Sequence, residues 1–103
     1  MKDWTQKEFE QFIQNRGTGL MYFYTPLCGT CLMASKMLEV VQKLYPKLPL
    51  GKADLNYMPG LAEGLEITSV PCLLLISGGE IVEKIYAFHS VPFLHEQIQQ
   101  KIL

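Results

Sequence analysis

The chain has 103 residues, of which 49% are hydrophobic and 18% charged, so it suits one compact domain, residues 1–103, with an apolar core. Nine Lys and Arg balance ten Asp and Glu without any basic run, which argues against nucleic acid and membrane surfaces as partners. Neither a secretory leader nor an apolar run of membrane-spanning length is present, so we expect a cytoplasmic protein.

The first half of the chain predicts a helix, a strand and a second helix. Residues 5–8 have the form of a capping box, and the apolar residues that follow share one helical face until about Gly17. Residues 20–24 are apolar and aromatic, which is typical of a buried strand. A turn then leads into a long helix over residues 31–44, and Pro46 follows its end.

The second half predicts two further helices and three strands. In chain order these are a strand over 50–55, a short helix over 60–65, strands over 72–76 and 81–87, and a helix after Ser90 that has Pro92 in its first turn. Gly78 and Gly79 between the last two strands indicate a hairpin. A helical crossover permits the first two strands to be parallel, and the hairpin makes the last two antiparallel. We therefore expect an α/β sandwich around a mixed four-stranded sheet.

Cys28 and Cys31 lie three residues apart at the start of the predicted 31–44 helix, close enough to form a disulfide. The unpaired N–H groups of a helix N-terminus favour a thiolate, so Cys28 is the better nucleophile. Cys31 lies one turn into the helix, where it can attack a mixed disulfide that Cys28 forms. The spacing therefore predicts a catalytic dithiol.

A structural zinc site is the main alternative for a Cys-x-x-Cys pair. Such a site needs four Cys or His ligands, and the remaining candidates are Cys72, His89 and His95, which do not form a second close pair. Three cysteines also cannot form a complete internal disulfide framework. An inert buried pair is the other alternative, although the flanking Gly and Thr suit a packed core poorly.

The segment 22–31, together with Ser69-Val70-Pro71 and a strand that ends in Gly78-Gly79-Glu80, resembles the thioredoxin family. Five further residues sit at corresponding places: Lys52, Asn56, Pro59, Gly60 and Ala62. The resemblance runs from Phe9 to the end of the chain and implies the thioredoxin fold, with the usual N-terminal strand missing.

The resemblance implies a thiol-disulfide oxidoreductase that reduces or exchanges protein disulfides without a cofactor. Pro71 would be in cis and would lie against the Cys28 sulfur, with the Val70 backbone offered to an extended substrate. Tyr24, Leu27, Gly29 and Thr30 would complete the substrate-binding surface. Lys52 would stabilise a thiolate from beneath the site. Electrons would come from a thioredoxin reductase or a low-molecular-weight thiol, and we expect a monomer.

Several residues depart from the family pattern. Tyr22 stands where the family has a buried Asp for proton transfer, and a phenol cannot serve as a carboxylate base. Tyr24 and Leu27 each stand where the family commonly has Trp. Thr30 replaces Pro in the commonest motif, and because it keeps its backbone N–H we expect a protein less reducing than a typical thioredoxin.

Cys72 follows Pro71 directly and gives rise to a competing hypothesis. If the Pro71 loop faces the dithiol, Cys28, Cys31 and Cys72 could hold a soft metal or part of an iron-sulfur cluster. A small buried side chain at the start of a strand is the simpler interpretation of Cys72. A peptide-binding adaptor without efficient catalysis is a third possibility, given the missing carboxylate.

Overall fold

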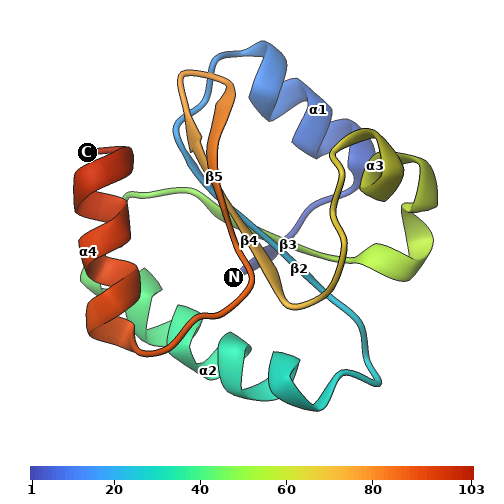
Figure 1. Ribbon diagram of the computed structural model, residues 1–103. Coiled ribbons are helices and arrows are strands. Elements are labelled where there is room, and N and C mark those ends of the chain that lie inside the picture. Colours follow the sequence, from blue (N-terminus) through green and yellow to red (C-terminus); the bar gives the residue numbers. More distant parts are fainter.

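The computed structural model describes residues 1–103 and places one mixed sheet between two layers of helices (Figure 1). The strands are β1 (Lys2–Asp3), β2 (Gly19–Tyr24), β3 (Leu50–Asp54), β4 (Cys72–Ser77) and β5 (Glu80–Ile85). The helices are α1 (Gln6–Gln14), α2 (Gly29–Leu44), α3 (Pro59–Gly64) and α4 (Val91–Lys101), with a 3-10 turn, η1 (Leu55–Tyr57). All eight predicted elements are confirmed with small shifts at their ends.

The sheet has the strand order β1-β3-β2-β4-β5. Strands β1 and β2 both pair with β3 in parallel, whereas β4 is antiparallel to β2 and β5 is antiparallel to β4. Tyr22 in the central strand β2 lies opposite Lys52 of β3 and Leu73 of β4. The predicted parallel and antiparallel pairings are therefore confirmed.

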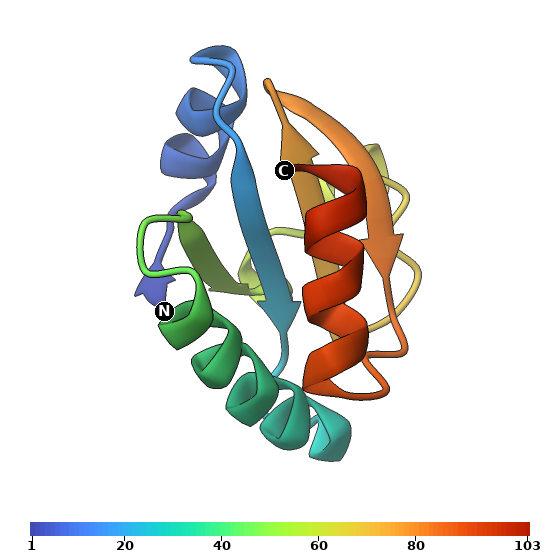
Figure 2. The ribbon, with the colours of Figure 1, turned by 90° about the vertical axis from the view of Figure 1, so that its left-hand side faces the viewer.

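Helices α2 and α4 cover one face of the sheet, and α1 and α3 cover the other (Figures 1 and 2). Strand side chains alternate between the two apolar cores that result. Tyr22 and Leu73 belong to the core under α2 and α4, while Phe23, Cys72 and Leu74 belong to the core under α1 and α3. Strands β2 and β4 are nearly continuous apolar runs because both of their faces are buried.

Local sequence signals explain where several elements begin and turn. Thr5 and Glu8 form the predicted capping box, with the Glu8 N–H donating to Thr5 Oγ1 at 3.1 Å and the Thr5 N–H donating to Glu8 Oε1 at 3.0 Å. Gly78 and Gly79 form the β4–β5 turn with φ values of 58° and 82°, a region that favours glycine. Ser90 caps α4 by accepting the Phe93 N–H at 3.2 Å.

The prediction that the N-terminal strand is missing is wrong, and the sheet has five strands rather than four. Lys2 and Asp3 pair with Gly51 and Lys52, and the Trp4 N–H donates to the Lys52 carbonyl at 3.0 Å. A strand of only two exposed residues is too short to show the alternation by which a strand is recognised in a sequence.

No helix of the structure combines the length and the apolar character needed to cross a membrane.

Candidate active site

Cys28 is the residue that caps the N-terminus of α2. Its backbone is extended, with φ −87° and ψ 109°, and its sulfur accepts the Cys31 N–H at 3.2 Å. The sulfur therefore faces the positive end of the helix dipole, which favours a thiolate at this position. Thr30 Oγ1 lies 3.4 Å from the same sulfur.

Cys31 lies in the first turn of α2 and is only 4% exposed, whereas Cys28 is half-buried. The two sulfurs are joined in a disulfide, and the Cα atoms of the two cysteines are 5.2 Å apart. The structure thus shows the oxidised form of the pair, with Cys28 as the outer sulfur and Cys31 as the inner one.

The loop before β4 lies beside the outer sulfur. The Val70 carbonyl oxygen is 3.8 Å from Cys28 Sγ, and the Val70–Pro71 peptide bond is cis. Val70 is half-buried and Pro71 is buried. The structure therefore brings Val70 and the dithiol together, which is the arrangement that the resemblance implies.

The remaining predicted contact residues surround the start of α2. Leu27, directly before Cys28, is 99% exposed, and Gly29 and Thr30 are exposed as well. Tyr24 is half-buried and stacks on Tyr22 with ring centroids 5.7 Å apart. All these residues lie at the β2–α2 end of the molecule, and their roles toward a substrate stay predictions.

Tyr22 and Ser35 form a hydrogen-bonded pair behind the inner cysteine. The Tyr22 hydroxyl donates to the Cys31 carbonyl at 2.9 Å and accepts from Ser35 Oγ at 3.0 Å. Burial raises the pKa of Tyr22, although the hydrogen bond from Ser35 opposes this effect. The sequence analysis missed Ser35, whose position one helical turn after Cys31 was the available signal.

Cys72 is not part of the dithiol site. It is fully buried in the core under α1 and α3, whereas α2 packs on the opposite face of the sheet. Burial raises the pKa of Cys72 to about 11, while the hydrogen bond with Tyr86 and the charge of Lys84 lower it. No three Cys, His, Asp or Glu side chains are grouped in a way that could hold a metal ion. The structure therefore supports neither a three-thiol cluster nor a zinc site that includes His89 or His95.

Lys52 makes two contacts of its own on the sheet. Its ammonium group lies 3.9 Å from the Asp3 carboxylate and 6.0 Å from the centre of the Tyr24 ring. Asp3 belongs to β1 and Tyr24 to β2, the two strands that flank β3. The stabilisation of a thiolate by Lys52 stays a prediction.

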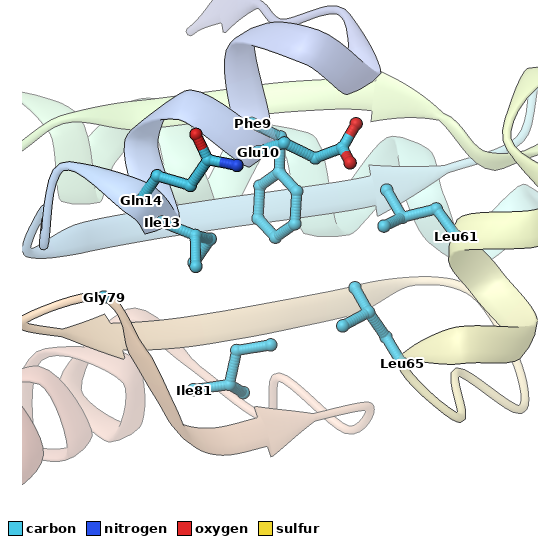
Figure 3. Close-up of a pocket in the computed structure, with 8 residues that line it drawn as sticks. All are labelled: Phe9, Glu10, Ile13, Gln14, Leu61, Leu65, Gly79 and Ile81. Atoms are coloured by element: carbon cyan, nitrogen blue, oxygen red, sulfur yellow. The ribbon is translucent and has the colours of Figure 1, made fainter.

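A hollow of about 370 Å³ lies away from the dithiol, between α1, α3 and the β4–β5 hairpin (Figure 3). Phe9 and Ile13 of α1 face Leu61 of α3 across it, together with Leu65, which directly follows α3. Ile81 of β5 lies on the remaining side. No cysteine lines this hollow, so it is separate from the Cys28–Cys31 dithiol.

An outer sulfur at a helix N-terminus, joined to a buried inner sulfur beside an open backbone segment, defines the class of thiol-disulfide exchange proteins. The comparisons with known proteins agree with this class. Residues 1–100 match the family model described as Thioredoxin. The chain is 52% identical over 82 residues to the thioredoxin-like protein YusE of Bacillus subtilis (strain 168), which covers 80% of this chain and 77% of that protein.

Two further relatives extend over almost the whole chain. The thioredoxin of Staphylococcus saprophyticus is 31% identical over 99 residues, covering 95% of this chain and 94% of that protein. The oxidised mitochondrial thioredoxin 3 of Saccharomyces cerevisiae superposes with a TM-score of 0.84 at 26% identity, covering 97% of this chain and 94% of that one. The chain belongs to the thioredoxin family, and it is a thiol-disulfide oxidoreductase. The exchange chemistry of this family needs no cofactor.

Proposed function

We propose that the chain reduces protein disulfides, with Cys28 as the attacking thiol and Cys31 as the resolving thiol. The Cys28 thiolate attacks one sulfur of the substrate disulfide, and the second substrate sulfur leaves as a thiolate that takes up a proton. Cys31, after losing its proton, attacks Cys28 Sγ and releases the first substrate sulfur. The substrate gains two electrons and two protons, and the Cys28–Cys31 dithiol becomes the disulfide.

The observation that carries this assignment is the unequal surroundings of the two sulfurs. Cys28 Sγ accepts a helix N–H and is reachable from outside, whereas Cys31 is 4% exposed. A thiol reacts through its thiolate and needs access to its target, so the outer sulfur attacks first. The inner sulfur reacts within the same helical turn, where no second encounter is needed.

An external electron donor completes the cycle. We assign this role to a thioredoxin reductase or to a low-molecular-weight thiol, either of which would transfer two electrons to the Cys28–Cys31 disulfide. Single-turnover reduction of the disulfide by each donor, followed by the appearance of two free thiols, separates these sources.

We further propose that residues 1–103 act as a single-domain monomer in the cytoplasm. The cysteines support this setting, because three of them, with Cys72 free, do not form the complete disulfide framework that is typical of secreted domains. Light scattering at assay concentration measures the molar mass and so tests whether the protein is a monomer. Fractionation followed by immunoblotting tests the location.

Trapping with a Cys31→Ser variant tests the assignment of the two thiols. This variant should accumulate mixed disulfides at Cys28 that a reductant releases, because the resolving thiol is absent. The Cys28→Ser variant is the control and should trap little, and Cys72→Ala should behave as the parent protein does. Equal trapping by the Cys28→Ser and Cys31→Ser variants would contradict the assigned order.

A further inference from the structure

Two hollows adjoin Val70, next to the reactive sulfur. The first, of about 390 Å³, has Thr30 and Phe88 among its lining residues. The second, of about 300 Å³, includes Thr25 and Ile67. Val70 lines both of them, and its carbonyl oxygen is 3.8 Å from Cys28 Sγ. The Cys28 sulfur therefore lies beside the residue that the two hollows share.

Neither hollow is lined by an Asp, Glu, Lys or Arg side chain. The sequence accounts for this, because residues 17–35, 67–79 and 85–88, which provide most of the lining, contain none of these four residue types. His89, in the first hollow, is the one lining residue with a basic side chain. The surface beside Cys28 thus offers no fixed charge to a bound segment.

Exposed apolar side chains continue this surface around the start of α2. Leu27 is 99% exposed, Leu32 is 66% exposed and Met33, which also lines the first hollow, is 61% exposed. Exposed apolar side chains near a reactive sulfur are typical of a site of interaction. A charged side chain that is buried against it loses hydration and finds no partner, which costs free energy.

We propose that this surface binds an extended polypeptide segment whose side chains two residues before and two residues after the reacting cysteine are uncharged. In an extended chain, side chains at positions i−2, i and i+2 point to the same side. If the cysteine points at Cys28, its neighbours at −2 and +2 therefore point toward the two hollows. This inference deepens the proposed exchange reaction at Cys28 and rests on it.

Chromogenic peptide substrates test the proposal. Each peptide carries one cysteine as a mixed disulfide with 2-nitro-5-thiobenzoate, so that attack by Cys28 on the peptide sulfur releases the coloured thiolate. Five peptides are compared at pH 8: an uncharged parent, and peptides with a single Lys or Glu at −2 or +2. Every rate constant is divided by that for 2-hydroxyethyl disulfide, a small neutral reference.

We expect each single charge, of either sign, to lower the normalised rate constant by about fivefold or more, because the cost is one of desolvation. Charge complementarity then provides the sharper test. Met33 lines the first hollow and Ile67 lines the second. Met33→Glu should therefore restore the rate for the peptide with Lys at one of the two positions, and Ile67→Glu should restore it for the peptide with Lys at the other. Ala62→Glu, in the second hollow, replaces Ile67→Glu if the latter fails to fold.

Val40→Glu is the matched control, because Val40 is a 45% exposed apolar residue on α2 that lines neither hollow. It should rescue neither Lys peptide. Three results would each overturn the proposal. The normalised rate constants could be equal for charged and uncharged peptides, a charge of only one sign could lower them, or both Glu variants could rescue the same peptide. A dimer that Leu32→Lys dissociates would do so too, because the surface would then be an interface between copies of this chain.

The two levels of the argument fail in different ways. If neither the reference disulfide nor any peptide is reduced, the proposed function itself is wrong. If the reference is reduced and all the peptides react alike, the exchange reaction stands and only the preference for uncharged segments is wrong.

Discussion

The hydroxyl of Tyr22 donates a hydrogen bond to the backbone carbonyl of Cys31, which ties the central strand β2 to the first turn of α2. Ser35 fixes the same hydroxyl from one helical turn further on. Burial raises the pKa of Tyr22 above its ordinary value, so the phenol stays neutral near neutral pH and donates without titrating. The turn that carries the inner sulfur is thus held by a contact that is insensitive to pH.

Tyr22→Phe should lower the free energy of unfolding by about 1 kcal/mol, because it removes one buried hydrogen bond to Cys31 and leaves Ser35 without its partner. It should also slow the resolving step more than the attack by Cys28. Urea denaturation measures the first effect, and single-turnover kinetics measure the second. The resolving step is followed as release of substrate from a preformed mixed disulfide.

Tyr24→Phe provides the control for stability, because Tyr24 stacks on Tyr22 but its hydroxyl forms no hydrogen bond in the structure. Equal losses of stability in the two variants would show that the Tyr22 hydroxyl contributes nothing specific. Equal slowing of attack and resolution by Tyr22→Phe would remove its role in positioning Cys31.

Cys72 should make the protein less stable as the pH rises from about 9 to about 11. Burial raises the pKa of this thiol from 9.0 to about 11 in the folded state, so the unfolded thiol ionises first. The stabilisation is present below pH 9 and is lost as the pH rises to the folded value. The free energy of unfolding that is lost over that window is about 2–3 kcal/mol.

The measurement uses a Cys28→Ser/Cys31→Ser background, which prevents disulfide exchange at high pH. Free energies of unfolding are compared with and without Cys72→Ala at several pH values from 8 to 11. The Cys72→Ala protein should lose less stability over this range, whatever its stability at pH 8. Parallel pH profiles would contradict the raised pKa.

Thr30→Val should make the reduction potential more negative. The Thr30 hydroxyl lies 3.4 Å from Cys28 Sγ and can donate to the thiolate of the reduced form. Loss of a hydrogen bond worth about 0.5–1.5 kcal/mol corresponds to a shift of roughly 10–30 mV for a two-electron couple. Equilibration with glutathione buffers measures the potential, and Val keeps the shape of the side chain. An unchanged or less negative potential would rule out this role for the hydroxyl.

Much of the fold could be predicted because its signals are local. The Thr5–Glu8 capping box and the Gly78-Gly79 turn each need only a few neighbouring residues, and the structure contains both. The pairing of Cys28 with Cys31 is local too, since the spacing places both sulfurs on one helical turn.

What escaped prediction depends on contacts between distant parts of the chain. Ser35 gains its role only because the sheet brings Tyr22 under the first turn of α2. Cys72 lies near the dithiol in the predicted topology, but the alternation of side chains along β4 turns it to the other face of the sheet. Strand β1 exists because β3 offers it an edge, and Lys2 and Asp3 show no pattern of their own.

Gly51→Ala should test how strongly β1 is held to that edge. The Trp4 ring lies against Gly51, and a Cβ atom added at Gly51 would overlap the ring. Overpacking of this kind costs about 1–3 kcal/mol, so the free energy of unfolding should fall by that amount. Trp4 is the only tryptophan of the chain, and its fluorescence should shift to longer wavelength as the ring moves into water.

Gly64→Ala is the control, because nothing lies within 4 Å of the added Cβ, and it should leave the emission unchanged. Parent-like stability and emission in Gly51→Ala would mean that Trp4 does not hold β1 against β3.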